Sequence, residues 1–275
     1  MSYQTLMVHL HIGHSNADLL QITRSLAERL NTNVIGIMVG QPTQMIYGKG
    51  YALLDFFDKE QAHIEQKITE SEAQFHEVFE GFSKTVEWRS IITREPMAGY
   101  IVAEACSADI IVTSVSPSDF YEGPNAVNAG EIIMQVGRPV IVVPNAIKNL
   151  KLENILIGWK DTREARRAIA DALPLLKIAK KVTLVEITDE DEKASATKRL
   201  DEVLAWLKSH GVTAEPMVSI AVDTDATQLI AIAKQQGADI VVAGAYGHSR
   251  LRQWVLGGVT NDLLQRTDLC SLLSH

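Results

Sequence analysis

Residues 238–260 read ADIVVAGAYGHSRLRQWVLGGVT, and this stretch decides how the rest of the chain is interpreted. Its first part, residues 240–243, is a short apolar run that is typical of a strand buried on both faces. Its last part, from residue 258 onward, has the pattern of a helix start. Between them lie Gly244 and Gly247, then nine residues, then Gly257 and Gly258. Because glycines let the main chain approach a ligand and a helix start offers unpaired N–H groups to an anion, the stretch predicts a phosphate cradle.

The pattern of strands and helices occurs twice along the chain. Residues 34–38 match residues 182–186 at an offset of 148, and residues 108–112 match residues 238–242 at an offset of 130. In each half, five apolar strands alternate with helices, which is typical of a doubly wound parallel sheet. A length of 275 residues suits two domains of ordinary size. We therefore predict an α/β protein with two tandem Rossmann-like domains, residues 1–147 and residues 148–275.

Hydrophobic periodicity places the individual elements of both halves. In the first half, strands are predicted at residues 6–10, 34–39, 86–92, 110–113 and 139–143, and helices at 16–30, 55–82 and 97–106, with a cap at Asn16 or Asp18. In the second half, strands are predicted at residues 155–159, 182–187, 212–220, 240–243 and 271–273, and helices at 162–178, 193–210 and 226–236. Residues 41–54 are predicted to form an apolar loop, and residues 144–149 a linker.

The composition is that of an ordinary soluble globular protein, with 46% hydrophobic and 22% charged residues. A net charge of −8 argues against nucleic acid or an anionic membrane as the main partner. Cys106 and Cys270 lie far apart in apolar contexts, so no disulfide framework is expected. The chain also has no long apolar run and no secretory leader pattern. A cytoplasmic protein is the expectation.

Motifs of rapid catalysis are not found in the sequence. It has no Gly-x-Ser-x-Gly elbow, no His-Glu-x-x-His pair and no Gly-Lys-Ser/Thr phosphate loop. Asp161 and Arg250 are candidates for assisting slow hydrolysis of a bound nucleotide, yet no residue is identified as a general base. An enzyme with rapid turnover is not expected.

Three histidines near the N-terminus, His9, His11 and His14, prompt a metal hypothesis. Strand alternation places His9 and His11 on the same face, and His14 follows in the turn. Because no cysteine or acidic residue joins them locally, we favour a packed strand end and assign no metal.

At this point the residues resemble a known family. Two α/β halves of this size, a strand-end Gly-x-x-Gly, a nine-residue spacer and a Gly-Gly-Val-Thr helix start are similar to the universal stress protein family in its tandem form. The nucleotide-binding branch of that family has Gly, two residues, Gly, nine residues, Gly, and then Ser or Thr. Gly244, Gly247 and Gly257 match this pattern, whereas Gly258 stands where the hydroxyl is usual. Thr260 offers a hydroxyl two residues later.

The resemblance implies that the second half binds ATP or a related adenine nucleotide, with or without Mg²⁺. It places the phosphates over the main-chain N–H groups of Gly247, Gly258, Val259 and Thr260, with Ala243 and Gly244 along the ribose. The end of the strand at residues 155–159 meets the adenine, and there Lys160 replaces the usual Asp while Asp161 is one position along. The candidate nucleotide-binding residues are Gly158, Lys160, Asp161, Ala243, Gly244, Gly247, His248, Ser249, Arg250, Gly257, Gly258, Val259 and Thr260.

The family also suggests how the halves meet and what the chain does. Its domains have an adenine nucleotide alpha hydrolase-like fold, and their fifth strands pair across an interface. Residues 140–143 and 271–273 are therefore expected to pair within the chain as a pseudo-dimer, and a homodimer is left open. The implied function is that of a cytoplasmic stress-response sensor or scaffold with unknown client proteins.

Two departures from the family pattern keep an alternative open. Lys160 and Gly258 differ from the usual residues, so the chain could instead be a ligand-free interaction module or a carrier of another small ligand. The first half has proline and an acidic residue where the cradle glycines would be, in residues 114–130. We therefore expect the first half to be a degenerate repeat.

Overall fold

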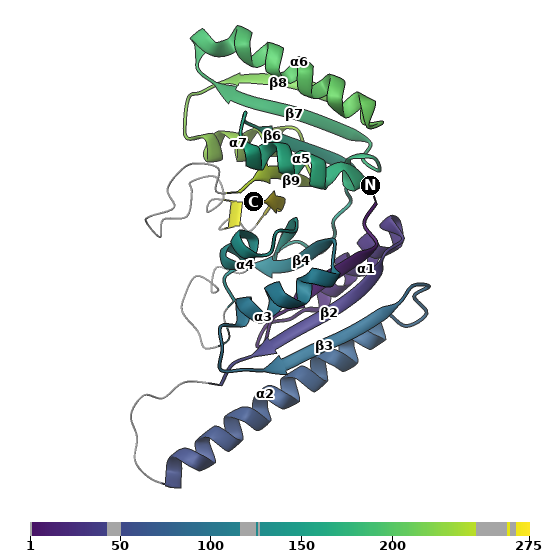
Figure 1. Ribbon diagram of the computed structural model, residues 1–275, viewed down its shortest axis with the longest axis vertical. Helices are drawn as coiled ribbons and strands as arrows, with labels where there is room; N and C mark the ends of the chain where they lie inside the picture. Colours follow the sequence, from purple (N-terminus) through teal and green to yellow (C-terminus); the bar gives the residue numbers. More distant parts are fainter. Residues whose placement is uncertain (1, 43–50, 116–124, 126, 246–262, 265–267) are drawn as a thin grey trace.

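The computed structural model describes residues 2–42, 51–115, 125, 127–245, 263–264 and 268–275 (Figure 1). The first half contains β1 (Thr5–Leu10), α1 (Ala17–Leu30), β2 (Asn33–Gly40), α2 (Tyr51–Val78), β3 (Val86–Ile92), α3 (Met97–Glu104), η1 (Ala105–Ser107), β4 (Ile110–Val115), α4 (Ala129–Gln135) and β5 (Val140–Pro144). The second half contains β6 (Asn154–Trp159), α5 (Arg163–Leu176), β7 (Lys181–Thr188), η3 (Glu190–Glu192), α6 (Lys193–Ser209), β8 (Glu215–Ile220), α7 (Asp225–Gln235), β9 (Ile240–Gly244) and β10 (Cys270–Ser274).

All of these strands form one ten-stranded sheet in the order β3-β2-β1-β4-β5-β10-β9-β6-β7-β8. Every neighbouring pair is parallel except β5 and β10, which run antiparallel with Val142 opposite Ser271 and Val140 opposite Leu273. The order within the first half is therefore repeated in reverse by the second half. Figure 1 shows the two edge strands, β3 and β8, at opposite ends of the molecule. The expected pseudo-dimer of two five-stranded parallel sheets, joined through their last strands, is confirmed.

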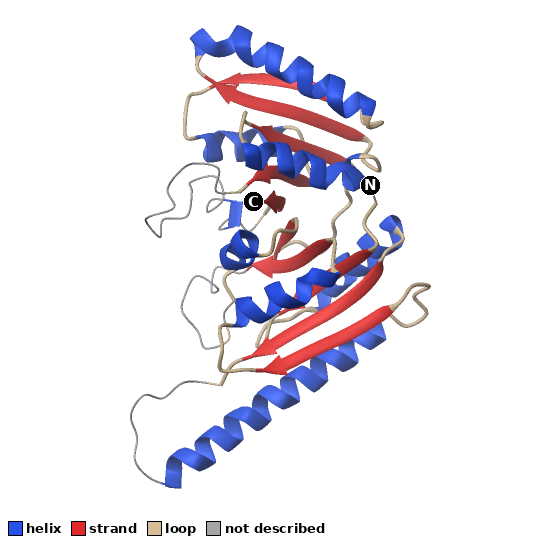
Figure 2. Ribbon diagram, viewed as in Figure 1, coloured by secondary structure: helices blue, strands red, loops and turns tan. Residues whose placement is uncertain are grey.

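Helices lie on both faces of this sheet, as Figure 2 shows. On one face α1, α2, α5 and α6 contribute side chains to the first apolar cluster, and on the other face α3, α4 and α7 contribute to the second. Covering both faces explains why the central strands are continuous apolar runs rather than alternating ones.

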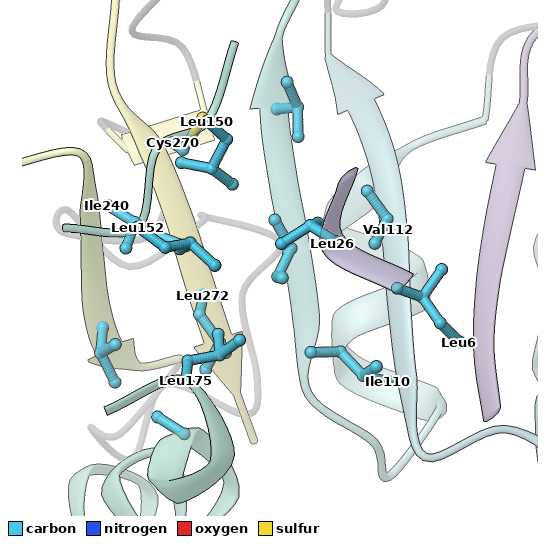
Figure 3. Packing of buried hydrophobic residues seen from close by; sticks show 14 of the residues in the cluster. Leu6, Leu26, Ile110, Val112, Leu150, Leu152, Leu175, Ile240, Cys270 and Leu272 are labelled. Atoms are coloured by element: carbon cyan, nitrogen blue, oxygen red, sulfur yellow. The ribbon is translucent and has the colours of Figure 1, made fainter. Parts of the chain in front are cut away.

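The apolar core continues across the junction between the halves (Figure 3). Leu6 and Val112 of the first half belong to the same cluster as Ile240 and Leu272 of the second. The Tyr3 hydroxyl also donates a hydrogen bond to the main-chain carbonyl of Asp171 on α5. The two halves therefore share buried apolar surface. The division of the chain into two domains between residues 147 and 148 stays a prediction.

Two expected elements differ from the observed ones, and one observed helix was not expected. The helix α2 begins at Tyr51, inside the segment expected to be an apolar loop, and ends at Val78 rather than at residue 82. Residues 51–54 read YALL, and this apolar run propagates the helix. The strand β8 begins at Glu215, three residues after the predicted start at residue 212. The helix α4 was not expected, because its seven residues are too few for a clear period, although Asn128 caps it by accepting a hydrogen bond from the Gly130 N–H at 2.8 Å.

Within the described ranges, no helix combines the length and apolarity needed to cross a bilayer.

Candidate functional site

The carboxyl ends of β6 and β9 lie side by side in the second half of the sheet. These strands are hydrogen-bonded neighbours, and Gly158 stands opposite Ala243 in their register. Ligands of doubly wound sheets bind at this edge, where the chain leaves neighbouring strands in different directions. The fold therefore brings together the candidate residues Gly158, Lys160, Asp161, Ala243 and Gly244.

The remaining candidates lie outside the described residues: Gly247, His248, Ser249, Arg250, Gly257, Gly258, Val259 and Thr260. Their role in holding phosphate stays a prediction from the sequence.

Gly244 lies directly against the start of α5. A Cβ atom at this position would lie 2.6 Å from the main-chain nitrogen of Ala165 and 2.6 Å from the carbonyl carbon of Glu164. Main-chain atoms cannot rotate away, so only glycine fits here without moving the helix. Gly158 is also closely packed, because a Cβ there would lie 2.8 Å from Cδ2 of Leu229. Packing against main-chain atoms therefore accounts for Gly244, whereas Gly158 meets only a leucine side chain that can shift.

The first turn of α5 carries its own negative charge beside Gly244. Glu164 is buried, with an exposed fraction of 7%, and Arg163 Nε donates to its Oε1 at 3.0 Å. Burial raises the pKa of the Glu164 carboxyl, but the hydrogen bond from its own main chain and the Arg163 guanidinium together hold that pKa below its ordinary value. Thr162 caps the helix by accepting a hydrogen bond from the Ala165 N–H at 3.2 Å. This helix start is an unfavourable position for phosphate because it already holds a carboxylate.

Two ion pairs flank the end of β6. Lys160 Nζ donates to Asp225 Oδ2 at 2.9 Å, which ties the strand end to the start of α7. Asp161 pairs with Arg166 on α5. Their side chains are between 44% and 58% exposed, and exposed ion pairs of this kind contribute little to stability. A ligand could therefore displace either pair at low cost.

A buried carboxylate paired with a partly exposed arginine near the strand ends was not anticipated from the sequence. Glu186 on β7 stands opposite Trp159 in the register and has an exposed fraction of 4%. Arg199 of α6 donates from Nε to Glu186 Oε1 at 2.9 Å. Glu186 Oε2 and Trp159 Nε1 are buried and have no hydrogen-bond partner in the described part of the chain. The available signal was a single charged residue inside the apolar strand VTLVEI, which predicts a basic partner on the covering helix.

The equivalent strand ends of the first half hold a histidine cluster. His9 Nδ1 and His11 Nε2 lie 3.0 Å and 3.2 Å from the same atom, Thr113 Oγ1, and both rings are buried. Burial, and then the neighbouring His11, hold the pKa of His9 well below its ordinary value, so His9 is neutral at pH 7. A shared hydroxyl explains the close packing of the two rings. In the described parts of the chain, no three metal-ligating side chains converge.

Asn16 holds the turn that follows these histidines. Its side chain accepts a hydrogen bond from the His11 N–H at 3.1 Å and donates one to the His11 carbonyl at 3.0 Å. It makes no side-chain cap for α1, although it occupies the cap position as predicted. The competing hydrogen bonds to the turn explain this difference.

Comparison with known proteins identifies the second half. Residues 151–272 match the model of the family described as the universal stress protein family. A universal stress protein of Methanocaldococcus jannaschii is 25% identical over 128 residues, which cover 45% of this chain and 77% of that protein. A universal stress protein of Synechocystis is 24% identical over 151 residues, covering 54% of this chain and 51% of that protein. The match thus spans about half the length of the Synechocystis relative.

Solved structures extend the likeness of fold to the whole chain. A universal stress protein from Archaeoglobus fulgidus superposes with a TM-score of 0.71 at 12% identity, covering 98% of this chain and 95% of that one. Another structure of a universal stress protein from Archaeoglobus fulgidus is a complex with dAMP. It is 14% identical and covers 52% of this chain and 98% of that one, with a TM-score of 0.34, which is too low to compare the two sites. Residues 151–272 are therefore identified as a universal stress protein domain, and the first half of the chain repeats the same fold in tandem.

Proposed function

We propose that the second half of this chain binds ATP or a related adenine nucleotide, with or without Mg²⁺, and that the chain acts as a cytoplasmic stress-response sensor or scaffold. The observation that carries the proposal is the position of the end of β9, from which the glycine-rich sequence continues. The strand β9 ends at Gly244, beside the end of β6, and the sequence then continues into Gly247, Gly257 and Gly258. A main chain rich in glycine at the switch point of a doubly wound sheet is a favourable setting for phosphate.

The charges around α5 refine where the phosphates are expected. The Glu164 carboxylate occupies the first turn of α5. Repulsion from this carboxylate disfavours phosphates at the first turn of α5. The Lys160 ammonium is half exposed just after the end of β6, where it can turn from Asp225 toward an anionic ligand.

A nucleotide titration with matched variants tests this proposal. Isothermal titration of the full chain with ATP should give binding that Gly247→Val abolishes, since a valine side chain would stand between the main chain and the phosphates. The matched control is Pro117→Val, at the equivalent position of the first half by the offset of 130. This control should bind ATP as the unaltered chain does. Binding that survives Gly247→Val, or an absence of binding in the unaltered chain, would refute the proposal.

A second candidate function is a ligand-free interaction module in which the glycines serve packing alone. The close contact of Gly244 with the main chain of α5 favours it, because packing requires this glycine even without a ligand. Mass spectrometry of the purified chain separates the two functions. A co-purifying adenine nucleotide supports the first function, whereas a chain that neither retains nor binds any nucleotide supports the second.

A further inference from the structure

The sheet has two outer edges, β3 at one end and β8 at the other. In a parallel ladder, alternate residues of an edge strand direct their N–H and C=O groups away from the sheet. The Thr93 N–H donates to the Gly40 carbonyl, so the odd-numbered residues of β3 face β2. The Ala221 N–H donates to the Thr188 carbonyl, so the odd-numbered residues of β8 face β7. The even-numbered residues of both strands therefore direct their main-chain groups outward.

The outer edge of β8 is protected in two ways. Pro216 stands at an outward-facing position and has no N–H to donate. The Gln228 side chain donates from Nε2 to the Ile220 carbonyl at 2.7 Å and accepts a hydrogen bond from the Val222 N–H at 3.0 Å. Proline in an edge strand and a cover over the edge both keep such a strand from pairing with another chain.

The outer edge of β3 has no such protection. Its outward-facing residues are Val86, Trp88, Ser90 and Ile92, and none of them is proline. Within the described part of the chain, the main-chain groups of these four residues take part in no hydrogen bond. Figure 1 shows β3 as the last strand at its end of the molecule. The strand thus presents a row of free donors and acceptors, which is a template for one more strand.

The side chains of β3 are complementary to a second copy of the same strand. Arg89 Nε donates to Glu87 Oε1 at 2.8 Å, so these two charges lie on one face of the strand, on either side of Trp88. In an antiparallel pair with its two-fold axis at Trp88, Glu87 stands opposite Arg89 of the copy. Opposite charges that face each other across two strands stabilise the pairing. An axis at Glu87 or at Arg89 would instead place like charges opposite each other.

The same register also satisfies the main chain. Val86 stands opposite Ser90 of the copy, and Trp88 opposite Trp88 of the copy. Each outward N–H of these three residues then meets an outward carbonyl, since residues of such a pair exchange both hydrogen bonds. The Trp88 indole already packs against Phe75, with ring centroids 5.3 Å apart, so its position is fixed before the copy arrives.

We propose that this chain forms a homodimer in which β3 pairs antiparallel with β3 of a second copy, about a two-fold axis at Trp88. The junction of β5 with β10 is an antiparallel pairing of the same kind within the chain. The dimer therefore continues one sheet through both copies. It uses the far end of the first half and does not depend on the nucleotide site proposed for the second half.

Sedimentation velocity of the full chain without nucleotide tests the proposal. The unaltered chain should pass from monomer to dimer as its concentration rises. Ser90→Pro removes an outward N–H and leaves the ladder with β2 intact, as Pro216 does in β8. It should weaken dimerisation at least about tenfold, because each dimer loses the hydrogen bonds of both copies at this position. Ser90→Ala, the matched control, should dimerise as the unaltered chain does.

Exchange of the two charges tests the register. Glu87→Arg and Arg89→Glu should each be monomeric, because each places like charges opposite each other in the pair. A mixture of the two variants should dimerise, since each copy then carries the charges that complement the other. This recovery cannot come from a misfolded variant, and far-ultraviolet circular dichroism checks the fold of each one alone.

A control at the other edge locates the interface. Val222, 85% exposed beyond the end of β8, can be changed to glutamate, and Val222→Glu should leave dimerisation unaltered. The proposal is overturned if the unaltered chain stays monomeric at every concentration, which would assign the β3 edge to a strand of a different protein. It is also overturned if Ser90→Pro dimerises with unaltered affinity, or if the two charge variants fail to associate when mixed.

Discussion

Replacing Gly244 by alanine tests whether this glycine is required by packing as well as by any ligand. The added methyl group would overlap the main chain of α5, because its position is 2.6 Å from Ala165 N and 2.6 Å from the Glu164 carbonyl carbon. Neither atom can move without displacing the first turn of the helix. The substitution therefore forces α5 away from β9 or distorts the strand end.

The expected cost follows from what overpacking does in a dense core. Inserting a methyl group without space typically destabilises a protein by about 1–3 kcal/mol. We expect the upper part of this range for Gly244→Ala, because main-chain atoms rather than a flexible side chain would have to move. The expected effect is thus a clear decrease in the urea concentration at the unfolding midpoint.

The matched control is Gly99→Ala in α3. A Cβ atom at Gly99 would meet no atom within 4 Å, so alanine fits there. It should stabilise the helix by about 0.5–1 kcal/mol because glycine is a poor helix former. Both variants are unfolded in urea without nucleotide, and helix content is followed by far-ultraviolet circular dichroism. If Gly244→Ala unfolds at the same urea concentration as the unaltered chain, the close approach of α5 to β9 is wrong.

Three further predictions concern ionisable groups that are buried or partly buried. Arg199→Met should destabilise the fold by about 3 kcal/mol because it leaves the Glu186 carboxylate buried without a partner, and adding Glu186→Gln should recover most of that loss in urea unfolding. The pKa of His9 is lowered in the folded chain, so the unfolded chain takes up a proton near pH 6.5 and the folded chain does not. The free energy of unfolding should therefore fall as the pH drops below 6.5, and it should fall less in His9→Gln. Equal pH profiles of the two proteins would contradict this assignment. Burial raises the pKa of Asp171, so its ionised form destabilises the folded state above that pKa. Asp171→Asn should therefore raise the unfolding midpoint at pH 7, and this gain should disappear as the pH falls below 3.8. A loss of stability at pH 7 would show that the ion pair with Arg167 outweighs burial.

Much of the fold could be predicted because its pattern is local and repeated. The repeat offsets of 148 and 130 relate β2 to β7 and β4 to β9, and these strands occupy equivalent places in the sheet. The pairing of β5 with β10 was expected from the family resemblance and is observed; its antiparallel direction was not predicted. Short helices and element ends were less predictable. The helix α4 has too few residues for a period to show, and the start of α2 is an apolar run that fits a loop or a helix.

The site was less predictable because its contacts join residues far apart in sequence. Lys160 was considered only as a substitute for the family's Asp, whereas its partner, Asp225, follows 65 residues later at the start of another helix. Gly158 and Gly244 were expected to face a ligand, but Gly158 contacts the Leu229 side chain and Gly244 is required by the main chain of α5. A sequence pattern shows that a side chain is absent, and only the packing shows which neighbour needs the space.

The central claim, that nucleotide binds only in the second half, is tested most directly by native mass spectrometry of the full chain with ATP. One nucleotide per chain is predicted, with none on Gly247→Val and one on Pro117→Val. Two nucleotides per chain, or one that persists in Gly247→Val, would contradict the claim.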